Sequence, residues 1–241
     1  PVEVQATTTL DFWLNQRPER IPLPADSLEI NHQKLMHVIG VRRDLNYLFH
    51  LHPEATTTPA LLTVKYVFEA PGLYKIWSEI KRAGAVHTFG HPLINVVGLG
   101  EVDRPQIDLS RQRLVGDHQI NLFVPDPLPA GEEVELSFDV HTPLEDYLGE
   151  PMHLVVVSDD LSYFLHGHPD DHHVSIFPRA WANGDGIPFH ITFPQPGFYK
   201  LFAQFRPVGL VLMEEEALTA SFWVQVAEAP ARQPLIFSRP V

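Results

Sequence analysis

The sequence predicts an all-β protein of two tandem β-sandwich domains that are related by internal duplication. Two observations carry this prediction. Short runs of β-branched and aromatic residues recur between Pro, Gly, Asp and Asn, and the 23 prolines leave no segment of helical length with a clean apolar stripe. In addition, one segment of eighteen residues occurs twice. Many short strands separated by turn residues are typical of sandwiches.

The expected strands lie between turn-forming residues along most of the chain. They cover residues 61–68, 73–80, 93–97, 119–124, 134–140, 153–157, 189–193, 198–205 and 220–226. Residues 211–218 contain three consecutive glutamates and are short enough to form either a helix or a loop turn, so both alternatives stay open.

The repeat is visible without any gap. MHVIGVRRDLNYLFHLHP at residues 36–53 and MHLVVVSDDLSYFLHGHP at residues 152–169 match at nine of eighteen positions. Further along, PGLYK at 71–75 corresponds to PGFYK at 196–200, and the offset grows from 116 to 125 residues. The extra residues of the second copy fall around 171–185, a stretch rich in His, Asn, Gly and Asp that predicts an elongated loop.

The repeat also sets the domain boundaries. We place the first sandwich at residues 1–102, the second at 103–228 and a Pro-rich tail at 229–241. The boundary precedes the polar connection Asp103-Arg104-Pro105. Each domain then has roughly the size of an immunoglobulin-type sandwich, about 100 residues.

Composition excludes several classes of function. The chain has no cysteine, which removes disulfide frameworks, Cys-based zinc sites and thiol nucleophiles. Its net charge of −13 repels phosphate backbones, so nucleic acid is not an expected partner. No apolar run of about 18 residues is present, so we expect no membrane-spanning helix. Pro1 opens directly into a polar, β-prone stretch, and the lack of a visible leader decides nothing about export.

The charge is divided unevenly between the two halves. Residues 1–102 carry 9 basic and 10 acidic side chains, whereas residues 103–241 carry 8 basic and 20 acidic ones. Desolvating a nearly neutral face costs less than desolvating a strongly acidic one. We therefore expect any protein partner to dock through the first half.

The repeated segment carries the residues that are suited to chemistry. In the second copy, His166 and His168 have i, i+2 spacing on a returning strand, so both rings lie on one face, roughly 7 Å apart at Cα. His153 lies thirteen residues before His166 on the opposing strand, and a hairpin closes the group. The first copy repeats this spacing, and the candidate metal ligands are therefore His37, His50, His52, His153, His166 and His168. One three-histidine cluster per domain is the expected arrangement.

Neutral imidazole suits copper and zinc, and a chain without cysteine favours Cu(II) or Zn(II). The adjacent Met36 and Met152 point to the other face of their strands, so we expect them in the core. The alternative to a metal site is a buried polar network, because repetition preserves hydrogen-bonded structural histidines equally well.

The remaining histidines give weaker signals. His87 and His91 are spaced i, i+4, but Thr88 stands where a zinc-protease helix needs its glutamate, so we reject that motif. His172 and His173 form an acidic-histidine loop beside His168. The isolated histidines have no assigned role: His32, His118, His141 and His190. The chain contains no nucleophile elbow, P-loop or dinucleotide fingerprint, so no catalytic residue is assigned and we expect a non-enzymatic protein.

The second copy resembles a known group of proteins. MHLVVVSDDLSYFLHGHPD, with PDPLPAGEEVELSFDV before it and FPQPGFYKLFAQF after it, is similar to secreted or periplasmic bacterial β-sandwich proteins with a Met-His-Leu…Asp-Leu…Phe-x-His-x-His-Pro signature. These are often found near copper-handling and cupredoxin-like proteins. The resemblance spans residues 117–226 and, more loosely, 31–80.

The resemblance implies immunoglobulin- or cupredoxin-like sandwiches and a periplasmic or secreted location. Carried over by position, the signature histidines fall on His153, His166 and His168, with weaker counterparts at His37, His50 and His52. The first copy has Arg42 and Arg43 where the second has Ser158 and Asp159, which weakens the expectation of cation binding there.

Two functions are therefore expected. The first is an extracytoplasmic module that binds copper or zinc through the repeated histidines. The second is a structural or accessory subunit docked on a membrane or cell-surface assembly, in which the histidines are core polar residues.

Overall fold

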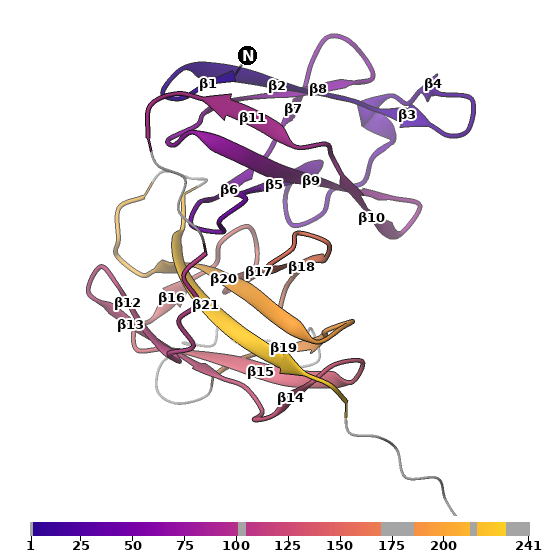
Figure 1. Ribbon diagram of the computed structural model, residues 1–241. Helices are drawn as coiled ribbons and strands as arrows, with labels where there is room; N and C mark the ends of the chain where they lie inside the picture. The colour runs from indigo at the N-terminus through magenta and orange to yellow at the C-terminus, as the bar shows by residue number, and fades with distance from the viewer. Residues whose placement is uncertain (1, 101–104, 170–185, 213–215, 230–241) are drawn as a thin grey trace, which may run out of the picture.

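The computed structural model describes residues 2–100, 105–169, 186–212 and 216–229, and it confirms an all-β chain of two sandwiches related by internal duplication (Figure 1). In chain order the elements are β1 Val2–Glu3, β2 Thr7–Trp13, β3 Asn15–Gln16, β4 Ile21–Pro22, a 3₁₀ turn η1 Ala25–Ser27, β5 Met36–Arg42, β6 Leu48–Leu51, β7 Glu54–Ala55, β8 Leu61–Val67, β9 Gly72–Arg82, β10 Ala85–Gly90, β11 Ile94–Val97, β12 Gln112–Val115, β13 His118–Phe123, β14 Leu128–Pro129, β15 Glu133–Val140, β16 Leu144–Glu145, β17 His153–Ser158, β18 Phe164–Gly167, β19 Ile187–Thr192, β20 Gly197–Pro207 and β21 Leu218–Ala227. Within the described residues no helix is long and apolar enough to cross a membrane.

Some predicted boundaries fall where the structure gives no description. These are the domain boundary at residues 102–104, the long loop at 171–185 with His172 and His173, and the tail from residue 230 onward. Residues 213–215 of the undecided segment 211–218 are also outside the described ranges, and its last residue, Leu218, begins β21.

The first sandwich packs a six-stranded sheet against a three-stranded one. The larger sheet has the order β1-β11-β9-β5-β6, with β10 also paired to β9, and the smaller has the order β2-β8-β7. Side chains from both sheets, including Val38, Leu62 and Tyr74, fill the core between them. The β3–β4 hairpin extends from one end.

The second sandwich repeats this plan. Its larger sheet has the order β14-β21-β20-β17-β18, with β16 paired to β20, and faces the four-stranded sheet β12-β13-β15-β19. Leu154, Leu201, Phe222 and Phe138 lie in the core between the two sheets. Among the described residues, every strand pair joins two strands of the same half.

The registers of the two copies agree residue by residue. β5 lies between β6 and β9 with His37 opposite Glu79, and β17 lies between β18 and β20 with His153 opposite Gln204. The hydroxyl of Tyr74 donates to the Ala70 carbonyl at 2.8 Å. Its counterpart, the Tyr199 hydroxyl, donates to the Gln195 carbonyl at 2.8 Å.

The two sandwiches pack together through the outer faces of their larger sheets. Along β5, Met36 and Val38 enter the first core, whereas Ile39 and Val41 point to the other face. There they join Val155, Val157, Phe202 and Trp223 of the second half in a third apolar cluster. Figure 1 shows β5, β6 and β9 facing β17, β18 and β20. The central strands are consequently buried on both faces.

An aromatic pair helps to close this junction. The rings of Trp77 in β9 and Phe164 in β18 stack with centroids 4.6 Å apart and planes 12° from parallel. Such a contact adds about 0.5–1.5 kcal/mol beyond the buried area. The junction therefore has a packed apolar interior, and the histidines lie at one end of it.

Candidate metal centre

All six predicted histidines gather at the junction of the two halves. His37 and His153 lie at the beginning of β5 and β17, and His50 and His166 lie on the partner strands β6 and β18. His52 and His168 follow directly after those partner strands. Because both outer sheet faces meet here, six strand-end side chains converge in one region.

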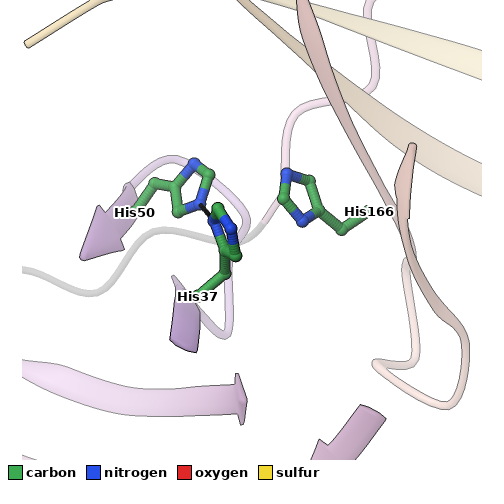
Figure 2. A group of neighbouring side chains, drawn as sticks. All are labelled: His37, His50 and His166. Atoms are coloured by element: carbon green, nitrogen blue, oxygen red, sulfur yellow. Dashed lines mark hydrogen bonds between the residues drawn. The ribbon is translucent and has the colours of Figure 1, made fainter. Parts of the chain in front are cut away.

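The expectation of a separate cluster in each domain needs correction. The rings of His37, His50 and His52 do contact one another, as do those of His153, His166 and His168. However, His166 also lies with His37 and His50, so that ring nitrogens of all three fall within 4.8 Å of one another (Figure 2). The faces that carry the triads pack against each other, which merges them into one cluster.

The triad of the second copy has the tighter geometry. His153 Nδ1 lies 3.2 Å from His166 Nε2 and 3.0 Å from His168 Nε2. His153 is fully buried, the side chain of His166 is 0% exposed, and His168 is half-buried. Three ring nitrogens therefore lie close together, and His168 is the most exposed of the three histidines.

The backbone fixes the tautomers of the two strand-end histidines. His153 Nε2 donates to the Tyr147 carbonyl at 2.8 Å, and His37 Nε2 donates to the Asn31 carbonyl at 2.9 Å. Burial lowers the pKa of both rings to about 3, so both are neutral at pH 7. A neutral ring with its proton on Nε2 has a lone pair on Nδ1. In both residues this lone pair faces the cluster.

The outer nitrogens of the partner-strand histidines bond to the opposite sandwich. His166 Nδ1 lies 2.8 Å from Glu79 Oε2 of the first half, and His50 Nδ1 lies 2.9 Å from Gln204 Oε1 of the second half. When Glu79 is ionised it only accepts, so His166 carries its proton on Nδ1 and its lone pair on Nε2. The Nε2 atoms then face the Nδ1 lone pairs of His153 and His37.

Glu79 is a buried carboxylate with two hydrogen-bond partners. Its other oxygen accepts a hydrogen bond from Thr88 Oγ1 at 2.7 Å. Thr88 is the residue that excluded a zinc-protease motif in the sequence, and in the structure it orients the Glu79 carboxyl group. Burial raises the pKa of Glu79 to about 7, so nearby charges decide whether the carboxyl group is ionised near neutral pH. A cation held by the adjacent imidazoles would favour the ionised form.

The remaining histidine rings are also kept neutral by burial. Desolvation lowers the pKa of His50 and His166 well below 6.5, and neighbouring rings lower both further. Burial also lowers the pKa of His168. Protonated imidazole cannot bind a metal, so these shifts keep the cluster in its ligating form near neutral pH.

Sequence reasoning missed one member of this cluster. His32 lies in the turn before β5, and its ring stacks on that of His168 with centroids 3.5 Å apart. The repeat could not find it, because its equivalent in the second copy is Leu148. The available signal was its position only five residues before His37.

Other residues singled out from the sequence lie elsewhere. Met36 and Met152 are buried in the two sandwich cores, as predicted. His87 lies in β10, so the rejected helix motif is indeed absent, and His91 Nε2 lies 2.8 Å from Ser78 Oγ. Arg42 is buried at the far end of β5, where it pairs with Asp44 and donates to the Pro71 carbonyl at 3.2 Å. Its charge therefore does not bear on the histidines.

Comparison with known proteins places the chain in one family and gives no activity. Residues 1–96 and 114–228 match the family described as "Domain of unknown function (DUF8832)", and the chain belongs to it. No curated protein is significantly similar.

Among solved structures, a variant of Salmonella alpha-2-macroglobulin is 12% identical with a TM-score of 0.28, and the match covers 95% of this chain but 14% of that one. A DUF3823 family protein from Bacteroides ovatus is 10% identical with a TM-score of 0.26, covering 92% and 99% of the two chains. The FN1 to FN3 domains of chicken CNTN1 are 8% identical with a TM-score of 0.25, covering 93% and 64%.

Proposed function

We propose that this member of the DUF8832 family is a non-enzymatic, extracytoplasmic binding module that holds a copper or zinc ion between its two sandwiches. The observation that carries the proposal is the convergence of His153 Nδ1, His166 Nε2 and His168 Nε2. The location is supported by the resemblance of the second repeat to secreted and periplasmic proteins.

The spacing of the nitrogens supports ligation. Bonds of about 2.0–2.1 Å to a tetrahedral ion place the ligand atoms about 3.4 Å apart. The distances from His153 Nδ1 to its two neighbours are 3.2 and 3.0 Å, so only a small expansion is needed. The lone pairs of His153 Nδ1 and His166 Nε2 face each other when Glu79 accepts from His166, and a cation between them removes their repulsion.

The hydrogen bonds of the outer ring nitrogens support metal ligation as well. Metal-ligating histidines usually donate their other ring N–H to a carbonyl or carboxylate, which orients the ring and increases its basicity. His153 has such a partner in the Tyr147 carbonyl and His166 has one in Glu79. The ionised Glu79 also offsets part of the charge of a divalent ion. For these reasons we place the stronger site at the second-copy triad.

The choice of ion follows from the ligand set. Neutral imidazole nitrogens suit both copper and zinc, and no thiolate is present to favour a softer ion. Holding the ion is favoured over catalysis because the sequence contains no nucleophile elbow, P-loop or dinucleotide fingerprint.

A second candidate function is docking to a protein partner through the first half. A cavity of about 770 Å³ lies between β2, β9 and β10 and includes Trp13 and Phe89 in its lining. These two side chains are 61% and 46% exposed, and exposed aromatic residues around a concavity are typical of interaction sites. In this case the histidines would serve as a structural network.

Metal analysis of protein purified without a chelating column separates the two functions. We expect about one equivalent of copper or zinc per chain, and we expect replacement of both His166 and His168 by Gln to abolish it. His141→Gln is the matched control, because that histidine lies 3.1 Å from Asp139 and away from the cluster. Unchanged metal uptake in the double variant, together with a lower melting temperature, would instead support the structural role.

A further inference from the structure

We infer that His32 is the exchange ligand through which the ion enters and leaves the buried triad of His153, His166 and His168. This inference rests on the proposed metal site and adds a residue that the repeat does not contain. It assigns His32 a role in the rate of metal transfer, separate from the equilibrium affinity supplied by the triad.

The position of His32 fits this role. Its ring stacks on the ring of His168, with planes 23° from parallel, and its centroid is 5.8 Å from that of His153. The side chain of His32 is 22% exposed, whereas His153 is fully buried. An ion moving from solvent to His153 and His166 therefore meets His32 and His168 first.

The turn that carries His32 has a left-handed backbone at both of its central residues. Asn31 and Lys34 exchange two backbone hydrogen bonds of 2.8 and 3.0 Å, and the residues between them, His32 and Gln33, have φ values of 43° and 65°. Such a turn favours Asn and Gly, and His is among the other residues that tolerate a left-handed backbone. The turn therefore holds the His32 ring in a defined position before β5.

The second copy shows that the fold does not require a histidine here. The equivalent turn joins Tyr147 and Glu150 by the same bonds, with Leu148 at φ 55° and Gly149 at φ 86° between them. Both turns present a carbonyl to a strand-end histidine. Leu148 meets this structural need while it is buried, so the imidazole of His32 serves another purpose.

A carboxylate of the second half lies next to His32. Its Nδ1 is 3.4 Å from Glu150 Oε1, and both side chains are partly exposed. A carboxylate at an opening attracts cations, and a proton held on Nδ1 leaves the Nε2 lone pair for the ion. The pair thus provides both attraction and a first ligand.

The transfer is a sequence of ligand substitutions without redox change. The hydrated ion first exchanges one water for a nitrogen of His32. A bond to His168 then forms through an expanded coordination shell, which zinc tolerates, and further waters are replaced by His153 and His166 as His32 dissociates. Release follows the same steps in reverse.

The test compares rates with affinity in His32→Leu, which copies the residue of the second turn. Zinc uptake is followed by stopped-flow with a zinc-responsive dye, and release is driven by EDTA. We expect unchanged stoichiometry and dissociation constant, with uptake and release both slowed by about tenfold or more. His32→Phe, which keeps a stacking ring without ligand nitrogens, should behave alike, and His141→Leu should match the wild type.

The outcomes separate the inference from the proposed function. Wild-type rates in both His32 variants would overturn the role of His32 while zinc binding stands. A loss of stoichiometric binding in folded His32→Leu, verified by circular dichroism, would make His32 an equilibrium ligand and would also overturn it. Absence of zinc and copper from the wild type would overturn the proposed function itself.

Discussion

Glu79 and Gln204 are equivalent residues of the two copies, and each bonds a histidine of the opposite sandwich. Glu79 Oε2 lies 2.8 Å from His166 Nδ1, and Gln204 Oε1 lies 2.9 Å from His50 Nδ1. The duplication therefore produced a reciprocal junction. The carboxylate in one copy and the amide in the other make the two triads chemically different.

This difference predicts how zinc affinity changes when Glu79 is replaced by glutamine, the residue of the other copy. Glu79→Gln should weaken zinc binding by about tenfold to a hundredfold, because the carboxylate orients His166 and increases its basicity. Chelator competition measures the change. Glu135→Gln is the control, since that exposed glutamate lies 3.6 Å from His190 on the surface. Equal affinity in Glu79→Gln and wild type would show that the carboxylate of Glu79 does not strengthen zinc binding through His166.

A second prediction concerns two facing core residues whose sizes compensate each other: a small residue opposite a large one in the first copy, and two of intermediate size in the second. A Cβ atom at Gly40 would lie 2.0 Å from the ring of Phe49, whereas the second copy has Val156 and Leu165 at these positions. Gly40→Val should therefore destabilise the protein by about 1–3 kcal/mol through overpacking.

The double variant tests the same pair directly. Adding Phe49→Leu to Gly40→Val copies the second core and should recover most of the lost stability in urea denaturation. Residues in contact are expected to show such non-additivity. Strictly additive effects of the two substitutions would mean that the two copies do not share this packing.

The sequence was sufficient to predict the residue ranges of nine strands, the duplication and the second-copy triad, because these depend on local spacing. It predicted no residue range for β2, β5, β10 or β12. Alternation along a strand placed His166 and His168 on one face, and the hairpin brought His153 to them. The merging of the triads was not predictable in this way. It depends on which outer sheet faces pack together. Nothing in the sequence around Ile39 or Val155 indicates that the two residues lie in the same apolar cluster. His32 was missed because Leu148 breaks the repeat at that position.

Metal should couple the two sandwiches, because His166, a proposed ligand from the second half, is hydrogen-bonded to Glu79 of the first half. Zinc at about 100 times its dissociation constant is expected to stabilise the folded chain by about 2.7 kcal/mol. Calorimetry with zinc and with EDTA measures this as a rise in melting temperature. The rise should disappear in His166→Gln, whose residue lies in both three-histidine groups, and should persist in His141→Gln. A zinc effect that survives His166→Gln would place the ion elsewhere.

The stability of the metal-free protein should fall as the pH is lowered from 7 to 5. Burial lowers the pKa of His37 and His153 from 6.5 to about 3, and it also lowers the pKa of His50, His166 and His168. Between the folded and unfolded pKa values the unfolded chain binds more protons, so acid favours unfolding. Each such histidine contributes up to about 1.4 kcal/mol per pH unit.

Glu79 acts in the opposite direction over part of this range. Its folded pKa of about 7 exceeds the ordinary value of 4.5, so the folded state binds the extra proton between these values. One carboxyl opposes five histidines, and the net slope should still show stability rising with pH. Urea denaturation in EDTA at pH 7, 6 and 5 measures the slope, which should be shallower in a His37→Gln, His153→Gln double variant. A pH-independent midpoint in the wild type would show that the cluster histidines accept protons in the folded state as easily as in the unfolded chain.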